Sequence, residues 1–198
     1  MTTWQKSGKL GAVNYYGAKE IAAAFRTVRK NTLTIAEDIP EDKYDFRPAE
    51  GSETVGEILT HIALGARFQE QVIFVEKRTK MEGFDFMKFM EGLKAERNQN
   101  RTKAQIIELL KTEGEKYATA VEDLTEEFLG EPILLPPGAA TPSRTRFDML
   151  LGVKEHEMHH RGQLMLIERM LGITPHLTRQ GQARMAAMRE AAAAKQTV

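Results

Sequence analysis

Apolar residues along most of this chain recur every three or four positions, the spacing that places them on one face of an α-helix. Four long segments show this pattern, and we predict each of them to be a helix. They span about residues 17–40, 54–80, 102–128 and 145–172. Few windows show the alternation of a half-buried strand, so the pattern predicts an all-α protein.

The ends of these segments carry residues that start and stop helices. Thr54 is followed three positions later by Glu57, the capping-box arrangement in which each side chain bonds the backbone of the other residue. Thr102 begins a second capping box, and Thr145 opens the fourth segment. Gly172 is placed to cap the end of the fourth helix. These residues support the predicted boundaries.

Four amphipathic helices of this length predict a four-helix bundle. The connection 81–101 is too long for a tight turn and is rich in phenylalanine, so we expect a short crossover helix that packs on the bundle. Such a crossover lets the second and third helices run in the same direction, but the pattern alone leaves the topology open. We expect 41–52 to be a loop, the proline-rich connection 129–144 to be a rigid surface loop, and the alanine-rich segment 180–195 to form an extra helix.

The length of 198 residues suits one domain, which we expect to have its core at about 17–172 and a C-terminal extension at 178–198. Basic and acidic residues number 28 each, so no net charge favours nucleic acid or an acidic membrane. The N-terminus lacks the apolar core of a signal peptide, and no apolar run reaches the ~18 residues of a membrane span. We therefore expect a soluble cytoplasmic protein that binds neither nucleic acid nor membrane. The absence of cysteine excludes disulfides, thiolate ligands and a cysteine nucleophile.

Three of the five histidines fall on the inward faces of the predicted helices. His156 and His160 lie one turn apart, so both rings could bind one metal ion. His61, on the second helix, could complete a three-ligand site with an open position, which is the plan of a catalytic metal site. The alternative for each residue is a core histidine with an ordinary hydrogen-bond partner. A shared metal explains the pair well, because each buried imidazole without a partner costs about 1–3 kcal/mol.

Several neighbouring residues are candidates for supporting roles. The segment 156–160 matches the His-Glu-x-x-His motif of zinc proteases, but the chain shows no sheet with the edge strand that such a protease uses. Glu157 and His159 are nevertheless candidate catalytic residues for proton transfer. Gln163, three residues after His160, could orient an imidazole ring.

Two further positions have local explanations. Glu57, one turn before His61, could also orient a ring, although it is equally placed to cap its own helix. His176 follows Pro175 outside the fourth helix, so we expect it at the surface.

Two segments together resemble the DinB/YfiT-like family of metalloenzymes. The first is IPEDKYDFRP at 39–48 followed by TVGEILTHI at 54–62, and the second is HEMHHRGQL at 156–164. Their order, spacing and helical placement agree with the family over most of residues 17–172. The tail at 180–198 lies outside the usual pattern.

The resemblance implies a four-helix bundle with up-down-down-up topology. It also implies a divalent metal, zinc or nickel, held by three histidines that map onto His61, His156 and His160, and it implies a homodimer. Characterised members of the family depend on thiols: they transfer bacillithiol or glutathione, or isomerise maleylpyruvate with mycothiol. The family's name derives from damage inducibility and implies no DNA repair chemistry.

We therefore expect a metal-dependent enzyme that transfers a low-molecular-weight thiol to an electrophile. Because the chain has no cysteine, the sulfur must come from a small molecule. Arg161 and Gln163 are candidates for binding this thiol cofactor, and Arg67 or Lys154 could hold a carboxylate, although each cation is also typical of a solvated helix face. Two alternatives stay open: metal-dependent hydrolysis, and a non-catalytic stress protein in which the metal only staples the bundle.

The assembly state has two interpretations. Phe84, Phe86 and Phe89, together with the alanine-rich tail, offer apolar surface beyond what four helices need. Because monomers seldom expose large apolar patches, this surface favours a homodimer. Alternatively, the phenylalanines fold back onto their own bundle.

Overall fold

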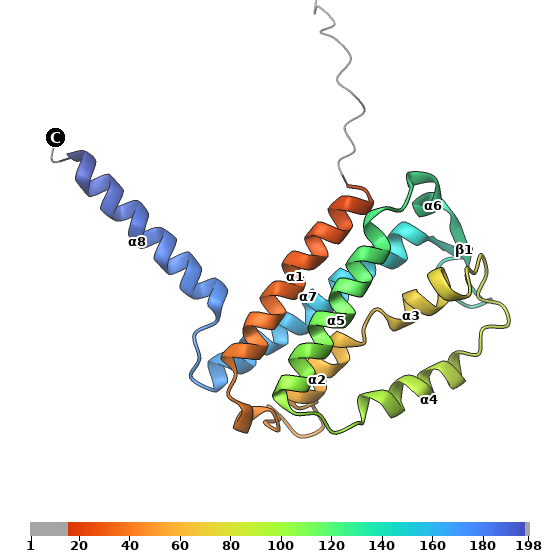
Figure 1. Ribbon diagram of the computed structural model, residues 1–198, viewed down its shortest axis with the longest axis horizontal. Helices are drawn as coiled ribbons and strands as arrows, with labels where there is room; N and C mark the ends of the chain where they lie inside the picture. The colour runs from red at the N-terminus through yellow and green to blue at the C-terminus, as the bar shows by residue number, and fades with distance from the viewer. Residues whose placement is uncertain (1–15, 197–198) are drawn as a thin grey trace, which may run out of the picture.

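The computed structural model, which describes residues 16–196, is a four-helix bundle (Figure 1). The bundle helices are α1 (Ala18–Asp38), α2 (Val55–Ala63), α5 (Lys103–Glu122) and α7 (Arg146–Met170). The shorter elements, in chain order, are η1 (Glu41–Lys43), α3 (Arg67–Gln69), the π-helix η2 (Glu70–Val75), α4 (Phe86–Arg97), α6 (Glu126–Gly130), β1 (Pro132–Leu134), β2 (Ser143–Thr145) and α8 (His176–Gln196).

The first two bundle helices lie diagonally across the bundle. α1 packs against α5 and α7, and α2 packs against the same two helices. α1 and α7 run in one direction and α2 and α5 in the other, which is the up-down-down-up topology (Figure 1). The predicted crossover helix is α4, and its connection lets α2 and α5 run parallel to each other.

Local capping starts the helices where the sequence predicts. The Thr54 hydroxyl accepts from the Glu57 N–H at 3.1 Å, while the Glu57 carboxylate accepts from the Thr54 N–H at 2.7 Å. Thr102 forms the equivalent capping box at the start of α5. The Thr145 hydroxyl accepts from the backbone of the first turn of α7. At the other end of α7, Gly172 has a φ of 78°, which favours glycine.

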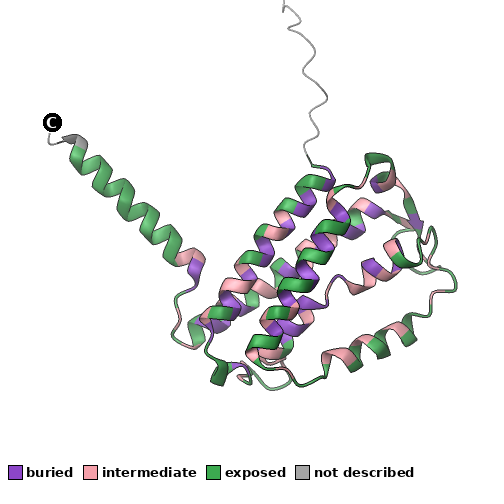
Figure 2. Ribbon diagram, in the orientation of Figure 1, coloured by how far each residue is buried: buried purple, intermediate pink, exposed green. Residues whose placement is uncertain are grey.

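The inward faces of the bundle helices are buried (Figure 2), and their apolar side chains form two clusters. One contains Phe25 and Tyr117, whose rings meet edge to face at 4.7 Å. The other contains Ile62 and Leu110. Arg29 is buried and contacts both clusters, since its guanidinium lies 5.1 Å from the Phe25 ring and donates to the carbonyls of Ile62 and Leu110.

The predicted second helix is interrupted and ends early. A turn at residues 64–66 separates α2 from α3, and the helical path stops at Val75 instead of about residue 80. The chain is then drawn toward β1: the Leu134 N–H donates to the Thr79 carbonyl, and the Met81 N–H donates to the Leu134 carbonyl. These long-range backbone bonds override the local helical pattern.

Two other predictions are corrected in the following region. The third helix ends at Glu122, and Thr125 caps the separate helix α6 by accepting from the Phe128 N–H at 3.2 Å. The predicted loop 129–144 contains β1, which pairs antiparallel with β2 in the register Pro132–Thr145. Residues 16–196 are therefore helical with one short hairpin, which the sequence did not predict because strands of three residues are too short to show alternation.

The C-terminal helix projects away from the bundle (Figure 1). Its residues from Arg179 to Ala194 are exposed (Figure 2), but it begins earlier than predicted, at His176. The prediction of a surface position for His176 is wrong. Its side chain is 3% exposed, and its Nε2 lies 3.2 Å from the Asn31 Oδ1 of α1, so it anchors α8 to the bundle.

The phenylalanines of the crossover fold back on the bundle. Phe84 and Phe89 lie 5.7 and 5.8 Å from the Phe68 ring, whereas Phe86 is 51% exposed. Assembly as a homodimer remains a prediction. Among the described residues, no helix combines the length and the apolar character needed to cross a membrane.

Candidate metal centre

The structure brings three histidines from two helices together. His61 lies near the end of α2, and His156 and His160 lie one turn apart in α7. The Nε2 of His156 lies 2.8 Å from the Nε2 of His61 and 3.1 Å from the Nε2 of His160. A ligand atom from each ring can be chosen so that all three lie within 4.8 Å of one another.

The donor set fits a divalent metal ion. His156 Nε2 lies close to a ring nitrogen of His61 and to one of His160. A neutral ring nitrogen carries either one proton or one lone pair, so it can form a hydrogen bond to only one of these neighbours. The other close contact is then left without a hydrogen bond. Nitrogen ligands bind zinc at about 2.0–2.1 Å, which is compatible with ring nitrogens clustered this closely. His61, His156 and His160 could therefore hold one ion.

The surroundings keep the rings in the form that binds metal. Burial lowers the pKa of His61 to about 4, and the nearby positive charge of Arg97 contributes further. Burial also lowers the pKa of His156, with a further contribution from His160. Metal ligation requires neutral imidazole, so both rings are ready to bind at neutral pH without releasing a proton.

Gln163 contacts the third ring of the cluster. Its Oε1 lies 2.8 Å from the Nδ1 of His160, so the ring donates its proton there and leaves the lone pair of Nε2 directed at the cluster. His159 is exposed, and its Nε2 lies 3.5 Å from the Nε2 of the same glutamine. It therefore flanks the cluster from outside.

A glycine allows the close approach of His156. A Cβ at Gly65 would lie 3.1 Å from His156 Nδ1 and 3.2 Å from the Ile62 carbonyl oxygen. The turn between α2 and α3 thus provides the space that the ring occupies. Nothing in the local helical pattern indicates this requirement.

Glu157 points into the bundle interior. It is 1% exposed, and its carboxylate accepts from Arg29 at 2.9–3.1 Å and from the Thr32 hydroxyl at 2.7 Å. These contacts commit the carboxylate to a buried ion pair, which does not support its predicted role in proton transfer.

The other candidate residues interact with groups outside the cluster. Glu57 caps α2 and pairs with Arg47 at 3.2 Å, so it does not orient His61. Lys154 lies 3.3 Å from the hydroxyl of Tyr16. Arg161 is half-buried on α7, where its charge lowers the pKa of His176, after the larger effect of burial.

A small cavity adjoins the cluster. It has a volume of about 230 Å³ and is lined by both His61 and His156. Most of its other lining residues are apolar or glycine, and the remaining polar side chains are Gln69 and Arg97. Arg97 comes from α4 and forms an ion pair with Glu53. A small molecule in this cavity would therefore lie between two cluster histidines and one cation.

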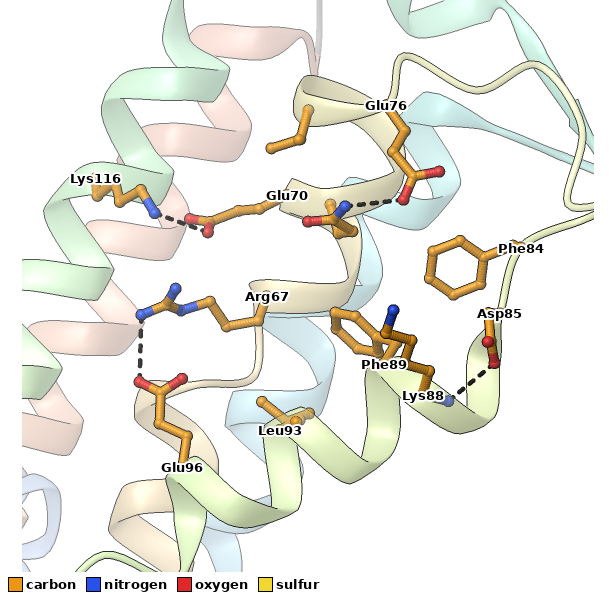
Figure 3. A pocket seen from close by; sticks show the side chains of 13 residues that line it. Arg67, Glu70, Glu76, Phe84, Asp85, Lys88, Phe89, Leu93, Glu96 and Lys116 are labelled. Atoms are coloured by element: carbon orange, nitrogen blue, oxygen red, sulfur yellow. Dashed lines mark hydrogen bonds and ion pairs between the residues drawn. The ribbon is translucent and has the colours of Figure 1, made fainter.

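A larger cavity of about 680 Å³ lies along α4 and shares Leu93 with the first (Figure 3). Arg67 at its wall donates to Glu113 at 2.8 Å and to Glu96 at 3.5 Å. The Lys116 ammonium donates to Glu70 at 3.0 Å on the α5 side (Figure 3). Arg67 thus joins α4 to α5 while lining a space of the size that small-molecule sites have.

Two arginines of the site region were missed from the sequence. Arg29 lies four residues after Phe25, so a charged residue on the apolar stripe of the first helix was an available signal. Arg97 offered no such signal, because α4 is only weakly amphipathic and its position depends on tertiary packing.

Comparison with known proteins shows the family to which the chain belongs. The sequence profile of the DinB superfamily matches residues 24–164. The chain belongs to the DinB superfamily. Within the superfamily, the uncharacterized protein YjoA of Bacillus subtilis strain 168 is 30% identical over 157 residues, covering 79% of this chain and 92% of YjoA.

Solved structures give the same DinB fold. The crystal structure of the DinB-like protein YjoA from Bacillus subtilis aligns with a TM-score of 0.57 at 28% identity, covering 78% of this chain and 93% of YjoA. YfiT from Bacillus subtilis aligns with a TM-score of 0.60 at 14% identity, covering 86% of this chain and 95% of YfiT. YfiT is described as a probable metal-dependent hydrolase with an unusual four-helix bundle topology. At this identity the likeness supports the fold alone.

Proposed function

We propose that this DinB-superfamily protein is a divalent-metal-dependent enzyme that transfers a low-molecular-weight thiol to an electrophile. The observation that carries the proposal is the convergence of three imidazole nitrogens beside a small, largely apolar cavity. A zinc or nickel ion held by His61, His156 and His160 would supply a Lewis acid that lowers the pKa of a thiol or a water in that cavity.

No carboxylate belongs to the histidine cluster found among the described residues, and this favours a thiol over water as the nucleophile. Glu157 is held by Arg29, and the metal-ligand group found among the described residues contains no carboxylate. Hydrolysis commonly uses a positioned general base, whereas a thiolate is already a strong nucleophile. The chain has no cysteine, so the thiol comes from outside and no protein thiolate competes for the metal. A reducing cytoplasm, which we propose as the location, keeps such thiols available.

The residues around the cavity have separate roles in this proposal. The apolar wall, which includes Phe68 and Leu93, excludes water from the reacting atoms. Arg97 holds an anionic group of the thiol or the acceptor, and Glu53 keeps that guanidinium in place. Gln163 keeps His160 in the required tautomer. Arg161 stays a candidate for a carboxylate of the thiol cofactor, although Arg97 lies closer to the cavity.

The proposal is tested by an activity screen on metal-loaded protein. Bacillithiol, mycothiol and glutathione are each assayed against halogenated and epoxide acceptors, with metal-free protein and His160→Ala as controls. We expect conjugation that requires the metal and is abolished in the variant. Rates equal to those of the metal-free control for every pair would contradict thiol transfer.

The second candidate is metal-dependent hydrolysis. It is favoured by the fold that this chain shares with YfiT, which is described as a probable metal-dependent hydrolase. In that case His159 would have to move protons, since Glu157 is committed to its ion pair. Measurable hydrolysis of ester or amide substrates, without conjugation, would favour it. Loss of this activity in His159→Ala, with metal content unchanged, would identify the proton carrier.

A non-catalytic role for the metal predicts a different dependence. If the ion only stabilises the folded bundle, its removal unfolds the chain. If the chain stays folded without metal but loses a reaction, the ion is catalytic. Circular dichroism before and after chelation separates the two outcomes.

A further inference from the structure

A buried ion pair lies in the bundle interior, one residue along the chain from a cluster histidine. Arg29 of α1 is 5% exposed and Glu157 of α7 is 1% exposed. Arg29 Nε donates to both carboxylate oxygens at 3.0 and 3.1 Å, and Nη2 donates to Oε2 at 2.9 Å. The Thr32 hydroxyl donates to Oε1 at 2.7 Å. The carboxylate is therefore well satisfied without water.

The same guanidinium reaches the other two bundle helices. Its Nη1 donates to the Leu110 carbonyl of α5 at 2.5 Å, and its Nη2 donates to the Ile62 carbonyl of α2 at 3.3 Å. Ile62 is in the last turn of α2, where carbonyls lack partners within the helix. One side chain thus joins all four helices of the bundle.

Two of these contacts are made beside the cluster histidines. Ile62 follows His61 in α2, and Glu157 follows His156 in α7. The distance of 2.8 Å between the Nε2 atoms of His61 and His156 depends on how α2 and α7 are placed relative to each other. Metal sites hold their ligand distances to within about 0.2 Å, so a small sliding of one helix would disturb the site.

Helix α5 leaves room for this arginine. A Cβ at Gly114 would lie 2.8 Å from Arg29 Nη1 and 2.9 Å from its Cγ. Glycine is disfavoured in the interior of a helix, yet any larger residue here would displace the arginine. Gly114 therefore makes room for Arg29, although glycine at this position makes the isolated helix less stable.

We infer that the Arg29–Glu157 pair is the positioning element of the histidine cluster. It holds α2 and α7 in the arrangement that brings their ring nitrogens together, and this inference rests on the proposed metal-dependent function. A buried ion pair is weak evidence for stability, because desolvation opposes the attraction and apolar replacements are often neutral or stabilising. The pair acts on the geometry of the site more than on the stability of the bundle.

The test replaces both charges together, as Arg29→Met with Glu157→Met. Two of the groups that lose a partner keep another one: the Ile62 carbonyl still accepts from the Gly65 N–H at 3.2 Å, and the Thr32 hydroxyl still donates to the Val28 carbonyl at 3.2 Å. We measure the urea midpoint of the metal-free protein, the Co²⁺ dissociation constant and the visible spectrum of bound Co²⁺. The midpoint should equal or exceed that of the wild type, while Co²⁺ binding weakens about tenfold or more and its absorption band changes.

A second variant keeps both charges and decides the case if the double variant fails to fold. Gly114→Ala displaces Arg29 without altering a histidine, and Gly92→Ala on α4, where a Cβ meets nothing within 4 Å, is its control. Gly114→Ala should weaken Co²⁺ binding relative to this control.

The outcomes separate the two proposals. A folded double variant with the wild-type constant and spectrum would overturn the inference and leave the metal function intact. Equal binding by Gly114→Ala and Gly92→Ala would do the same. A wild-type protein that binds no Co²⁺ would overturn the metal function, and the inference with it.

Discussion

Substitution of Gly65 by alanine should weaken metal binding without unfolding the protein. The added Cβ would lie 3.1 Å from His156 Nδ1 and 3.3 Å from its Cε1, below the 3.4 Å at which ordinary contacts begin. The Ile62 carbonyl oxygen, 3.2 Å from the added Cβ, belongs to the backbone and also accepts a hydrogen bond from Arg29. The ring of His156 is therefore the part that must move.

The expected magnitude follows from these distances. Relief of the contact requires a ring shift of about 0.3 Å, which exceeds the ~0.2 Å tolerance of metal–ligand distances. Changes to groups that orient a ligand typically cost about 10–100-fold in affinity, or about 1.4–2.8 kcal/mol. Gly65 has no positive φ, so alanine can adopt its backbone conformation and gains about 0.4–1 kcal/mol from the unfolded state. That gain offsets part of the strain in the metal-free protein.

Zinc dissociation constants are measured by competition with a chromophoric chelator, and stability is measured by thermal unfolding of the metal-free protein. The matched control is Gly162→Ala, in the same helix as His156 and His160, where a Cβ meets nothing within 4 Å. The control should stabilise the helix by about 1 kcal/mol and leave zinc affinity unchanged. A Gly65→Ala protein whose zinc affinity stays within twofold of the wild type would refute the reasoning.

Four further predictions follow from the same structure. His156→Ala combined with His160→Ala should abolish stoichiometric binding of zinc or nickel, and full retention of metal by elemental analysis would contradict the three-histidine site. The folded-state pKa of His61 is about 4 against an ordinary value of 6.5, so the metal-free protein should lose stability as pH falls from 6.5 toward 4; urea unfolding of His61→Phe should show a weaker dependence in that range. Glu168 is fully buried, and burial raises its pKa from 4.5 to about 7, so the stability it contributes is present below pH 4.5 and lost as pH rises through 7. Glu168→Gln should therefore exceed the wild type in stability at pH 8.5 by about 1–3 kcal/mol. If the difference in unfolding free energy between this variant and the wild type is the same at pH 5 as at pH 8.5, the explanation is wrong. Light scattering at micromolar concentration should give twice the 22.3 kDa chain mass for the expected homodimer, whereas a mass near 22.3 kDa would indicate a monomer.

Local sequence determined where three of the bundle helices begin and which two histidines of one helix share a face. The caps at Thr54, Thr102 and Thr145 form as predicted, because a capping bond joins residues only three positions apart. His156 and His160 share a face for a similar reason, since four residues span about one helical turn. Features that depend on neighbours within one turn can be predicted without knowledge of the fold.

Tertiary packing decided which nearby residues complete the site. The sequence does not distinguish Glu157 from His159 as a partner of the cluster, and only the position of Arg29 across the bundle assigns Glu157 to a buried ion pair. Arg97 reaches the cavity because α4 crosses beside it, and His176 is buried because the first residue of α8 lies against Asn31 of α1. Each outcome depends on which groups lose contact with water when distant segments meet, and that is set by non-local packing rather than by helical periodicity.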